Sequence, residues 1–191
     1  MQRTMCLLST VMLMCLTAQP ARAAECIGVT MPDEYKQGDE TLVLNGVGAR
    51  LATMLSVEVY VAGLYLKERS HDPAAIIATD QARYLELDFV RAVTRKEITD
   101  AWTEGFRKNA GSKAASLASG IDSLNAAMAD LRKGSKLSFS YVPGAGTSVA
   151  IDGVSKAVIP GADFASALVS IWLGEPPNKE VKTGLLGGKC N

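Results

Sequence analysis

The sequence lacks the groups on which most catalytic and metal-binding sites depend. It has one histidine and four cysteines in 191 residues, with no C-x-x-C pair, no phosphate-binding loop and no nucleophile motif. Metal and cofactor sites need such clusters, so we expect neither a metal nor a cofactor. Basic and acidic residues are equal in number, 20 of each, so no excess of positive charge favours nucleic acid or an anionic membrane.

Long apolar runs are also missing. The longest apolar run that the sequence has is short and typical of a signal peptide. A charged start at Arg3 precedes an apolar run over 7–16, and Ala21-Arg22-Ala23 has the A-x-A pattern of a cleavage site. A membrane-spanning helix needs about 20 residues, and this run is half as long. We expect residues 1–23 to be removed near Ala23, and residues 24–191 to form one domain that is not membrane-spanning and is periplasmic or secreted.

Cleavage at this point would change the charge and the cysteine content. Residues 1–23 hold two arginines and no acidic residue, so the 20 basic residues fall to 18 against 20 acidic ones, a net charge of −2. They also hold two of the four cysteines, which leaves Cys26 and Cys190 near the two ends of the mature chain. In an oxidising compartment such a pair is more often a structural disulfide than a redox or metal site. We expect a Cys26–Cys190 disulfide.

The mature chain alternates between strand and helix patterns. Asn45-Gly46, after a short strand at 41–44, predicts a hairpin turn because both residues tolerate positive φ. Alternation and turn residues predict further strands at 56–66, 83–90, 136–141, 148–151 and 156–159, and helical periodicity predicts helices at 73–77, 94–106, 117–131, 162–173 and 179–185. Strands in hairpin groups with helices inserted in pairs predict an α+β fold with one mainly antiparallel sheet covered on one side by helices.

The helix at 94–106 carries both a start signal and an apolar stripe. Thr94 and Glu97 form a capping box, and Ile98, Trp102 and Phe106 follow at intervals of four residues. The stripe predicts the face that packs against the sheet.

Other polar residues of the chain favour solvent. Glu97, Asp100 and Glu104 share the opposite face of the same helix, and we interpret them as solvated. His71 stands alone beside a helix start, and we expect it in a surface loop.

Arg50 is the most interesting candidate for chemistry. It ends a Gly-x-Gly-x-Arg run beside the strand at 56–66, in which Val59 and Tyr60 should take opposite faces. A guanidinium in a partly apolar cleft is a permanently charged fork for a carboxylate or a phenolate. A surface or salt-bridged arginine is the competing interpretation, and the spacing alone favours it.

Several stretches together resemble the chalcone isomerase-like family, in particular its bacterial exported branch. Their order and spacing cover nearly the whole mature chain, although no single stretch is diagnostic. The stretches are 45–50 (NGVGAR), 59–66 (VYVAGLYL), the helix 94–106, the hairpin 141–147 and the segment 159–174. The resemblance implies an open-faced β-sandwich, in which a large antiparallel sheet carries a layer of helices and a ligand cleft lies between them.

The resemblance also implies roles for individual residues. In the plant enzymes an arginine steadies the phenolate that attacks an enone, and a threonine, a tyrosine and an asparagine hold a polar network with water. Fatty-acid-binding members use an arginine and a tyrosine to hold a carboxylate. By this resemblance Arg50 takes the arginine's place and Tyr60 the threonine's, while Ile98, Gly105 and Ala165 stand where the family carries polar residues. Most of the catalytic network is therefore missing.

These assignments lead to a first hypothesis, a non-catalytic binding protein for a small amphipathic anion, either a fatty acid or a phenolic compound. Arg50 and Tyr60 would form the polar end of the cleft, and Ile98, Trp102 and Phe106 would supply apolar walls. A shifted alignment of the helix would instead bring threonines to the site, namely Thr94, Thr99 or Thr103.

Two alternatives stay open. One is an isomerase of the chalcone–flavanone type, an intramolecular lyase, with Arg50 and Tyr60 as catalytic candidates. The other is a structural or partner-binding role in the cell envelope, with Pro176-Pro177 and the polar segment 32–39 as docking pieces.

Overall fold

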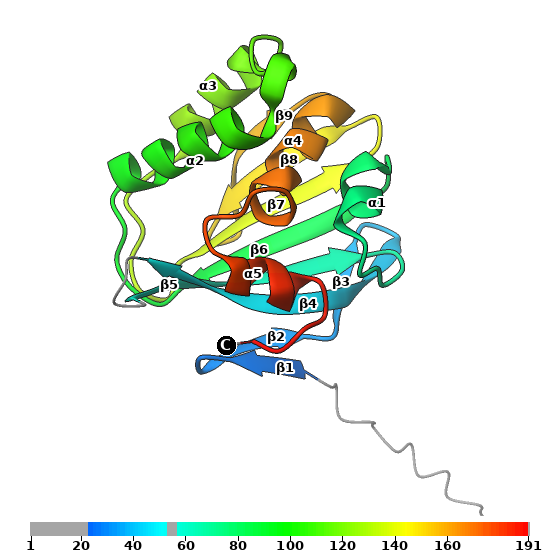
Figure 1. Ribbon diagram of the computed structural model, residues 1–191, viewed down its shortest axis with the longest axis vertical. Helices are drawn as coiled ribbons and strands as arrows, with labels where there is room; N and C mark the ends of the chain where they lie inside the picture. The colour runs from blue at the N-terminus through cyan, green and yellow to red at the C-terminus, as the bar shows by residue number, and fades with distance from the viewer. Residues whose placement is uncertain (1–22, 53–56, 191) are drawn as a thin grey trace, which may run out of the picture.

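One antiparallel sheet organises the molecule, and the helices lie on one of its faces (Figure 1). The computed structural model describes residues 23–52 and 57–190. The strands are β1 (Ala23–Cys26), β2 (Val29–Pro32), β3 (Glu34–Gln37), β4 (Glu40–Ala52), β5 (Val57–Leu66), β6 (Arg83–Phe89), β7 (Lys136–Val142), β8 (Gly146–Ile151) and β9 (Val154–Ile159). The helices are α1 (Pro73–Ala78), α2 (Arg95–Asn109), α3 (Ala118–Ala127), α4 (Ala162–Leu173) and α5 (Lys179–Leu185), with a short 3₁₀ turn at Gly111–Lys113.

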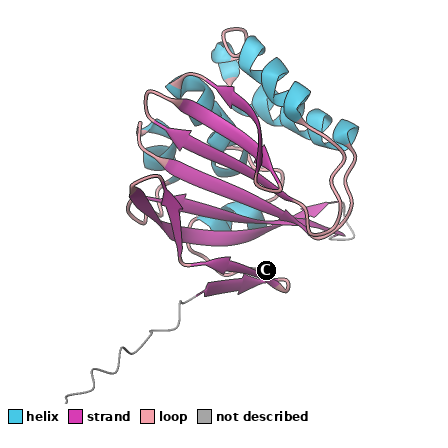
Figure 2. Cartoon of the chain, turned by 180° about the vertical axis from the view of Figure 1, so that it is seen from behind, coloured by secondary structure: helices cyan, strands magenta, loops and turns pink. Residues whose placement is uncertain are grey.

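The seven strands β3 to β9 are hydrogen-bonded in sequence order, each antiparallel to the next. β1 and β2 form a separate hairpin. Seen from behind, the strands are open to view and the helices lie beyond them (Figure 2). The predicted α+β class, with one antiparallel sheet and one helical layer, is confirmed.

Alternation along the strands gives the sheet two apolar faces. On the helix face, Ala62, Leu64 and Leu66 of β5 pack into a large core with the helices. On the opposite face, here called the back face, Val61 and Tyr65 of the same strand belong to a smaller core. The β1–β2 hairpin contributes side chains of its own to this core. A strand buried on both faces explains why the apolar pattern of β5 is nearly continuous.

The predicted hairpin turn at Asn45-Gly46 is wrong. Both residues lie inside the thirteen-residue strand β4, at a point where the register with β5 shifts between Leu44 and Gly46. A Cβ on Gly46 would collide with the backbone at the end of α5, including the carbonyl oxygen of Leu185 at 2.8 Å, and with the nitrogen of Gly187 just after it at 2.7 Å. Glycine therefore serves the close approach of a helix here, a role that the local sequence does not distinguish from a turn.

The predicted helix at 117–131 is shorter in the structure. α3 ends at Ala127, and Met128 is already extended. Leu131 instead forms an isolated bridge with Val93, with both backbone hydrogen bonds at 2.9 Å. This contact with a residue 38 positions earlier ends the helix before the Gly134 stop signal. Helical periodicity in the sequence does not predict such a contact.

The other helices agree with their sequence signals. Asp72 accepts hydrogen bonds from the first turn of α1, and the capping box of Thr94 and Glu97 is present at the start of α2. α4 and α5 have the predicted bounds. No helix among the described residues is long and apolar enough to cross a membrane.

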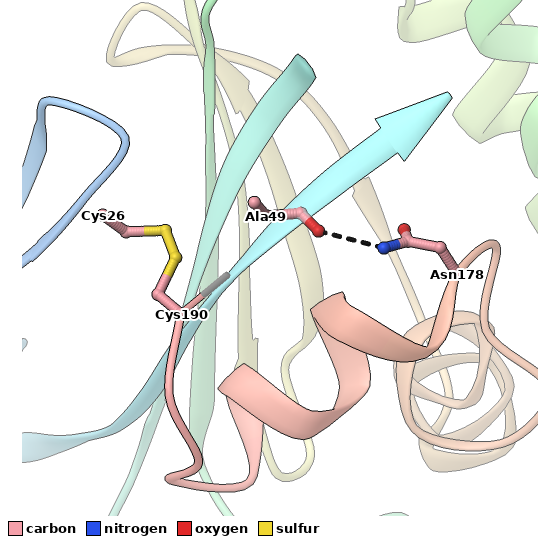
Figure 3. The surroundings of a disulfide bond; sticks show 4 residues. All are labelled: Cys26, Ala49, Asn178 and Cys190. Atoms are coloured by element: carbon pink, nitrogen blue, oxygen red, sulfur yellow. Dashed lines mark hydrogen bonds between the residues drawn. A yellow bond between two sulfur atoms is a disulfide. The ribbon is translucent and has the colours of Figure 1, made fainter. Parts of the chain in front are cut away.

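The predicted disulfide is present and joins Cys26, at the end of β1, to Cys190, after α5 (Figure 3). The two Cα atoms lie 5.7 Å apart. The bond therefore links the β1–β2 hairpin to the segment that follows α5. The predicted signal peptide lies almost entirely outside the described residues, as does Ser56 at the start of the predicted strand 56–66.

Candidate ligand-binding site

A cavity of about 480 Å³ lies between the β4–β6 end of the sheet and helices α2 and α4. This volume is in the range of about 300–1,000 Å³ that is typical of small-molecule sites. Strand residues form its floor, α2 forms one wall, and the segment between α4 and α5 forms part of its rim.

The floor is one cross-strand row. Arg50 of β4 is paired with Tyr60 of β5, and Tyr60 is paired with Phe89 of β6. Residues directly opposite one another across strands point to the same face, with Cβ atoms about 4.5–5.5 Å apart. Arg50, Tyr60 and Phe89 therefore stand side by side in the cavity, with the rings of Tyr60 and Phe89 in edge contact at 5.4 Å between centroids.

Val59 also lines the cavity, although alternation predicts it on the opposite face from Tyr60. The register explains the difference, because Arg50 pairs with Tyr60 whereas Leu51 pairs with Glu58. Val59 is thus an extra residue in β5, and such a bulge redirects the side chains next to it.

Tyr60 is buried and neutral. Its hydroxyl accepts a hydrogen bond from Nε1 of Trp172 at 2.9 Å. Burial raises the pKa of Tyr60 to about 12, although the indole N–H of Trp172 and the positive charge of Arg50 both act to lower it. At physiological pH the hydroxyl therefore keeps its proton and is able to donate it to a ligand.

Arg50 supplies a positive charge beside this hydroxyl. Its side chain is half-buried, and Nη1 donates to the carbonyl oxygen of Leu51. Within residues 23–52 and 57–190, no carboxylate lies within 4 Å of its guanidinium. The floor of the cavity thus combines a fixed cation with a neutral hydroxyl donor, which suits an anion.

The wall from α2 is apolar. Ile98 and Trp102 are 3% and 4% exposed and both line the cavity. Gly105 lies there too, and a Cβ at this position would approach Cγ2 of Ile171 in α4 to 2.8 Å. Glycine thus lets α2 and α4 approach each other, and the larger asparagine that the resemblance would put at Gly105 has no room.

Phe106, the third predicted wall residue, is placed elsewhere. It is buried against Phe164 at the start of α4, with ring centroids 5.7 Å apart, and it does not line the cavity. Each four-residue step along an α-helix rotates the side chain by about 40° relative to the last, so Phe106 is turned by about 80° around the helix axis from Ile98. None of the alternative threonines lines the cavity either: Thr94, Thr99 and Thr103 are absent from its wall.

Charged residues border the mouth. Glu97, Asp100 and Glu104 are exposed, as predicted, and they also border the cavity. Glu97 is paired with Arg91 at 3.5 Å and Glu104 with Lys108 at 3.3 Å. These pairs offset part of the acidic charge at the rim, which also includes Asp100 and Glu175, whereas Arg50 supplies a positive charge on the floor.

The rim also depends on the C-terminal helix. Pro176 and Pro177, just before α5, line the cavity. Asn178 follows them and donates through Nδ2 to the carbonyl oxygen of Ala49 at 3.2 Å, directly beside Arg50 (Figure 3). Pro176 and Pro177 therefore form part of the mouth of the cavity. A docking role for them in the cell envelope stays a prediction.

Among residues 23–52 and 57–190, no group of three or more histidine, cysteine, aspartate or glutamate side chains is placed so that it could hold a metal ion.

The comparisons with known proteins agree with this architecture. The profile of the family described as chalcone isomerase-like matches residues 23–187. The chain belongs to the chalcone isomerase-like family. No curated protein matches the chain. The crystal structure of an Arabidopsis thaliana fatty-acid binding protein is similar to it, with a TM-score of 0.71 at 16% identity over 86% of this chain and 96% of that protein. At this identity the similarity shows the fold.

The sequence did not reveal every residue of the site. Phe89 was recognised as a strand residue but not as a neighbour of Tyr60, because strand register is a tertiary property. Trp172 lies within the helix predicted at 162–173, but nothing in the sequence indicates that Tyr60 is its hydrogen-bond partner. The one available signal of such a partner was the rule that a buried tryptophan usually finds an acceptor for its indole N–H.

Proposed function

We propose that this chain binds a small amphipathic anion, such as a fatty acid or a phenolic compound, without transforming it. The observation that carries the proposal is the cross-strand pair of Arg50 and Tyr60 on the floor of a cavity whose inner walls are apolar and whose mouth is charged. The similar fold of a fatty-acid binding protein supports it.

Each part of the cavity has a role in this proposal. The carboxylate of a fatty acid accepts hydrogen bonds from the guanidinium of Arg50 and the hydroxyl of Tyr60. The alkyl chain lies against Phe89, Ile98 and Trp102, where its burial contributes about 0.8 kcal/mol per methylene group. Charge and hydrogen bonds thus select the head group, and apolar contacts supply most of the affinity.

An isomerase would use the same floor but needs more polar groups around it. An enone carbonyl that gains negative charge must be stabilised by several preorganised donors or by held water. The α2 wall offers Ile98 and Gly105, neither of which has a side-chain donor, and a single indole N–H, that of Trp102. Binding without catalysis therefore fits the cavity better, and loss of chalcone absorbance faster than in buffer alone would overturn this conclusion.

The decisive experiment compares Arg50→Ala with Arg132→Ala, which removes the same charge from an exposed position outside the cavity. The binding of dodecanoate is followed by titration calorimetry. A hydrogen bond to a charged group contributes about 1.5–3 kcal/mol, so Arg50→Ala should weaken binding about 10- to 100-fold. Arg132→Ala should bind as the wild-type protein does.

Two further measurements make the result specific. The affinity for 1-dodecanol, which has the same chain and no charge, should change little in Arg50→Ala, and the thermal unfolding midpoint should be retained. Equal affinity of Arg50→Ala and the wild-type protein for dodecanoate would contradict the proposal.

We also propose that the protein is exported as a member of the bacterial exported branch and works in the periplasm or outside the cell. The N-terminal pattern of residues 1–23 and the disulfide of Cys26 and Cys190 support export. The intact mass of the protein from fractionated cells should correspond to a chain that begins at Ala24. A cytoplasmic product that retains Met1 or Gln2 would exclude cleavage.

A further inference from the structure

One hydrogen bond behind the cavity floor sets the direction in which Tyr60 can donate. Trp172 is fully buried in α4 and does not line the cavity, yet its Nε1 lies 2.9 Å from the hydroxyl oxygen of Tyr60. Two aromatic neighbours, Trp102 and Phe139, hold the indole in place at centroid distances of 5.5 and 6.0 Å. The bond therefore joins two rigid groups.

The chemistry of the two groups fixes the direction of this bond. An indole N–H is only a donor, whereas a phenol has one donor and two acceptor lone pairs. The proton of the Tyr60 hydroxyl therefore points away from Trp172. Among the described residues this hydroxyl makes no other hydrogen bond, and Tyr60 lines the cavity. The contact of its ring with Phe89 also keeps the ring from turning aside.

We infer that Trp172 is a positioning residue that holds the Tyr60 hydroxyl as a donor toward the cavity, so that the site takes a hydrogen-bond acceptor, a carboxylate in particular, as its head group. This inference rests on the proposed function. Without the indole, the hydroxyl could turn its proton away from the ligand and present a lone pair, which would repel a carboxylate oxygen. Trp172 thus acts on the ligand only through Tyr60.

A double-mutant cycle on dodecanoate binding tests this indirect action. Trp172→Phe keeps an aromatic ring but removes the donor, and it should weaken binding about three- to tenfold. Tyr60→Phe should weaken binding by at least as much. When Tyr60→Phe is already present, adding Trp172→Phe should have no further effect, because the group that it positions is gone. An equal loss in both backgrounds, or no loss in either, would overturn the inference.

A ligand-free measurement separates this inference from the proposed function. The chain has two tryptophans, so its NMR spectrum has two indole N–H signals. The Trp172 signal should move upfield in Tyr60→Phe, since its acceptor is lost. Trp102 is the internal control, because its Nε1 has no hydrogen-bond partner among the described residues, and its signal should move much less.

The two measurements have distinct meanings. A Trp172 signal that stays in place in Tyr60→Phe overturns the positioning role, even if Trp172→Phe is too unstable for binding studies. Failure of the wild-type protein to bind dodecanoate, with the indole shift intact, instead rejects the fatty-acid part of the proposed function and leaves Trp172 as the group that orients Tyr60.

Discussion

Two glycines of β4 allow the backbone of α5 to approach the backbone of the sheet closely. Gly46 and Gly48 lie on the helix face, and a Cβ on either would collide with α5, at Leu185 and Val181 respectively. Arg50 is next on the same face, because alternate residues of a strand share a face. The Gly-x-Gly-x-Arg run thus places α5 and then presents the guanidinium just beyond it, at the cavity.

Substitution of Gly46 tests this packing. Gly46→Ala should lower the free energy of unfolding by about 1–3 kcal/mol, because the methyl group meets backbone that cannot rotate away. Gly63→Ala in β5 is the matched control, since its Cβ would meet the flexible Met31 side chain at 3.1 Å and should cost less. Urea unfolding of the two variants measures the difference. Equal stability losses would show that the approach of α5 is not the reason for glycine.

At the scale of elements, α2 is the wall that the sequence specifies best. Its capping box is complete, with Thr94 Oγ1 accepting from the Glu97 nitrogen at 3.2 Å and Glu97 accepting from the Thr94 nitrogen at 2.8 Å. This local signal fixes where the helix begins. It does not fix which residues of the stripe reach the cavity, since Ile98 and Trp102 do so and Phe106 does not.

The capping box should make stability depend on pH. The backbone N–H of Thr94, then its hydroxyl, then Arg91, lower the pKa of Glu97 below its ordinary value of 4.5. A lowered carboxylate pKa stabilises the fold above the unfolded-state pKa, and this stabilisation is lost as pH falls through the folded-state value. Glu97→Gln should therefore be less stable than the wild-type protein at pH 7, by about 0.5 kcal/mol for this solvent-exposed group, and this difference should shrink as pH falls below the ordinary carboxyl pKa.

Urea unfolding at pH 7 and pH 3.5 checks the size and the sign of this effect. Glu68→Gln, which removes an exposed carboxylate outside the capping box, is the control. A stability difference for Glu97→Gln that is the same at both pH values would contradict the assignment.

At the scale of the whole molecule, the disulfide holds the segment after α5 to the β1–β2 hairpin. Cys26 belongs to the back-face core and Cys190 packs against that core, although α5, which precedes Cys190, packs on the helix face. Asn45 adds a second tie, since its buried amide donates to the carbonyl oxygens of Leu185 at 2.7 Å and Ser70 at 3.0 Å. The C-terminal segment is therefore held to β1 by the disulfide and to β4 by Asn45.

Loss of the disulfide should lower the free energy of unfolding considerably. The bond closes a loop with a sequence separation of 164, for which the chain-entropy relation gives an upper value of about 5 kcal/mol. The double variant Cys26→Ser/Cys190→Ser should unfold at a lower denaturant midpoint than the oxidised protein and match the reduced wild-type protein. Identical midpoints for oxidised and reduced protein would rule out a stabilising bond.

The sequence by itself determined the class of the fold and most of its elements. Alternation, capping residues and turn glycines act over a few neighbours, so they predicted the strands β5 to β9, the capping box of α2, and the bounds of α4 and α5. They did not predict β1, β2 or β3, and they predicted only a short part of β4. The Cys26–Cys190 disulfide was predicted by elimination, because only two cysteines remain when residues 1–23 are taken as a signal peptide. Arg50 and Tyr60 were singled out by their residue types and by family resemblance.

Only the tertiary structure decided how these parts meet. The role of Asn45-Gly46 depends on α5, which lies about 140 residues away, and the end of α3 depends on the bridge between Val93 and Leu131. Strand register placed Phe89 beside Tyr60, and helix packing brought Trp172 within hydrogen-bonding distance of it. Such contacts join segments distant in sequence, and local patterns carry no information about them.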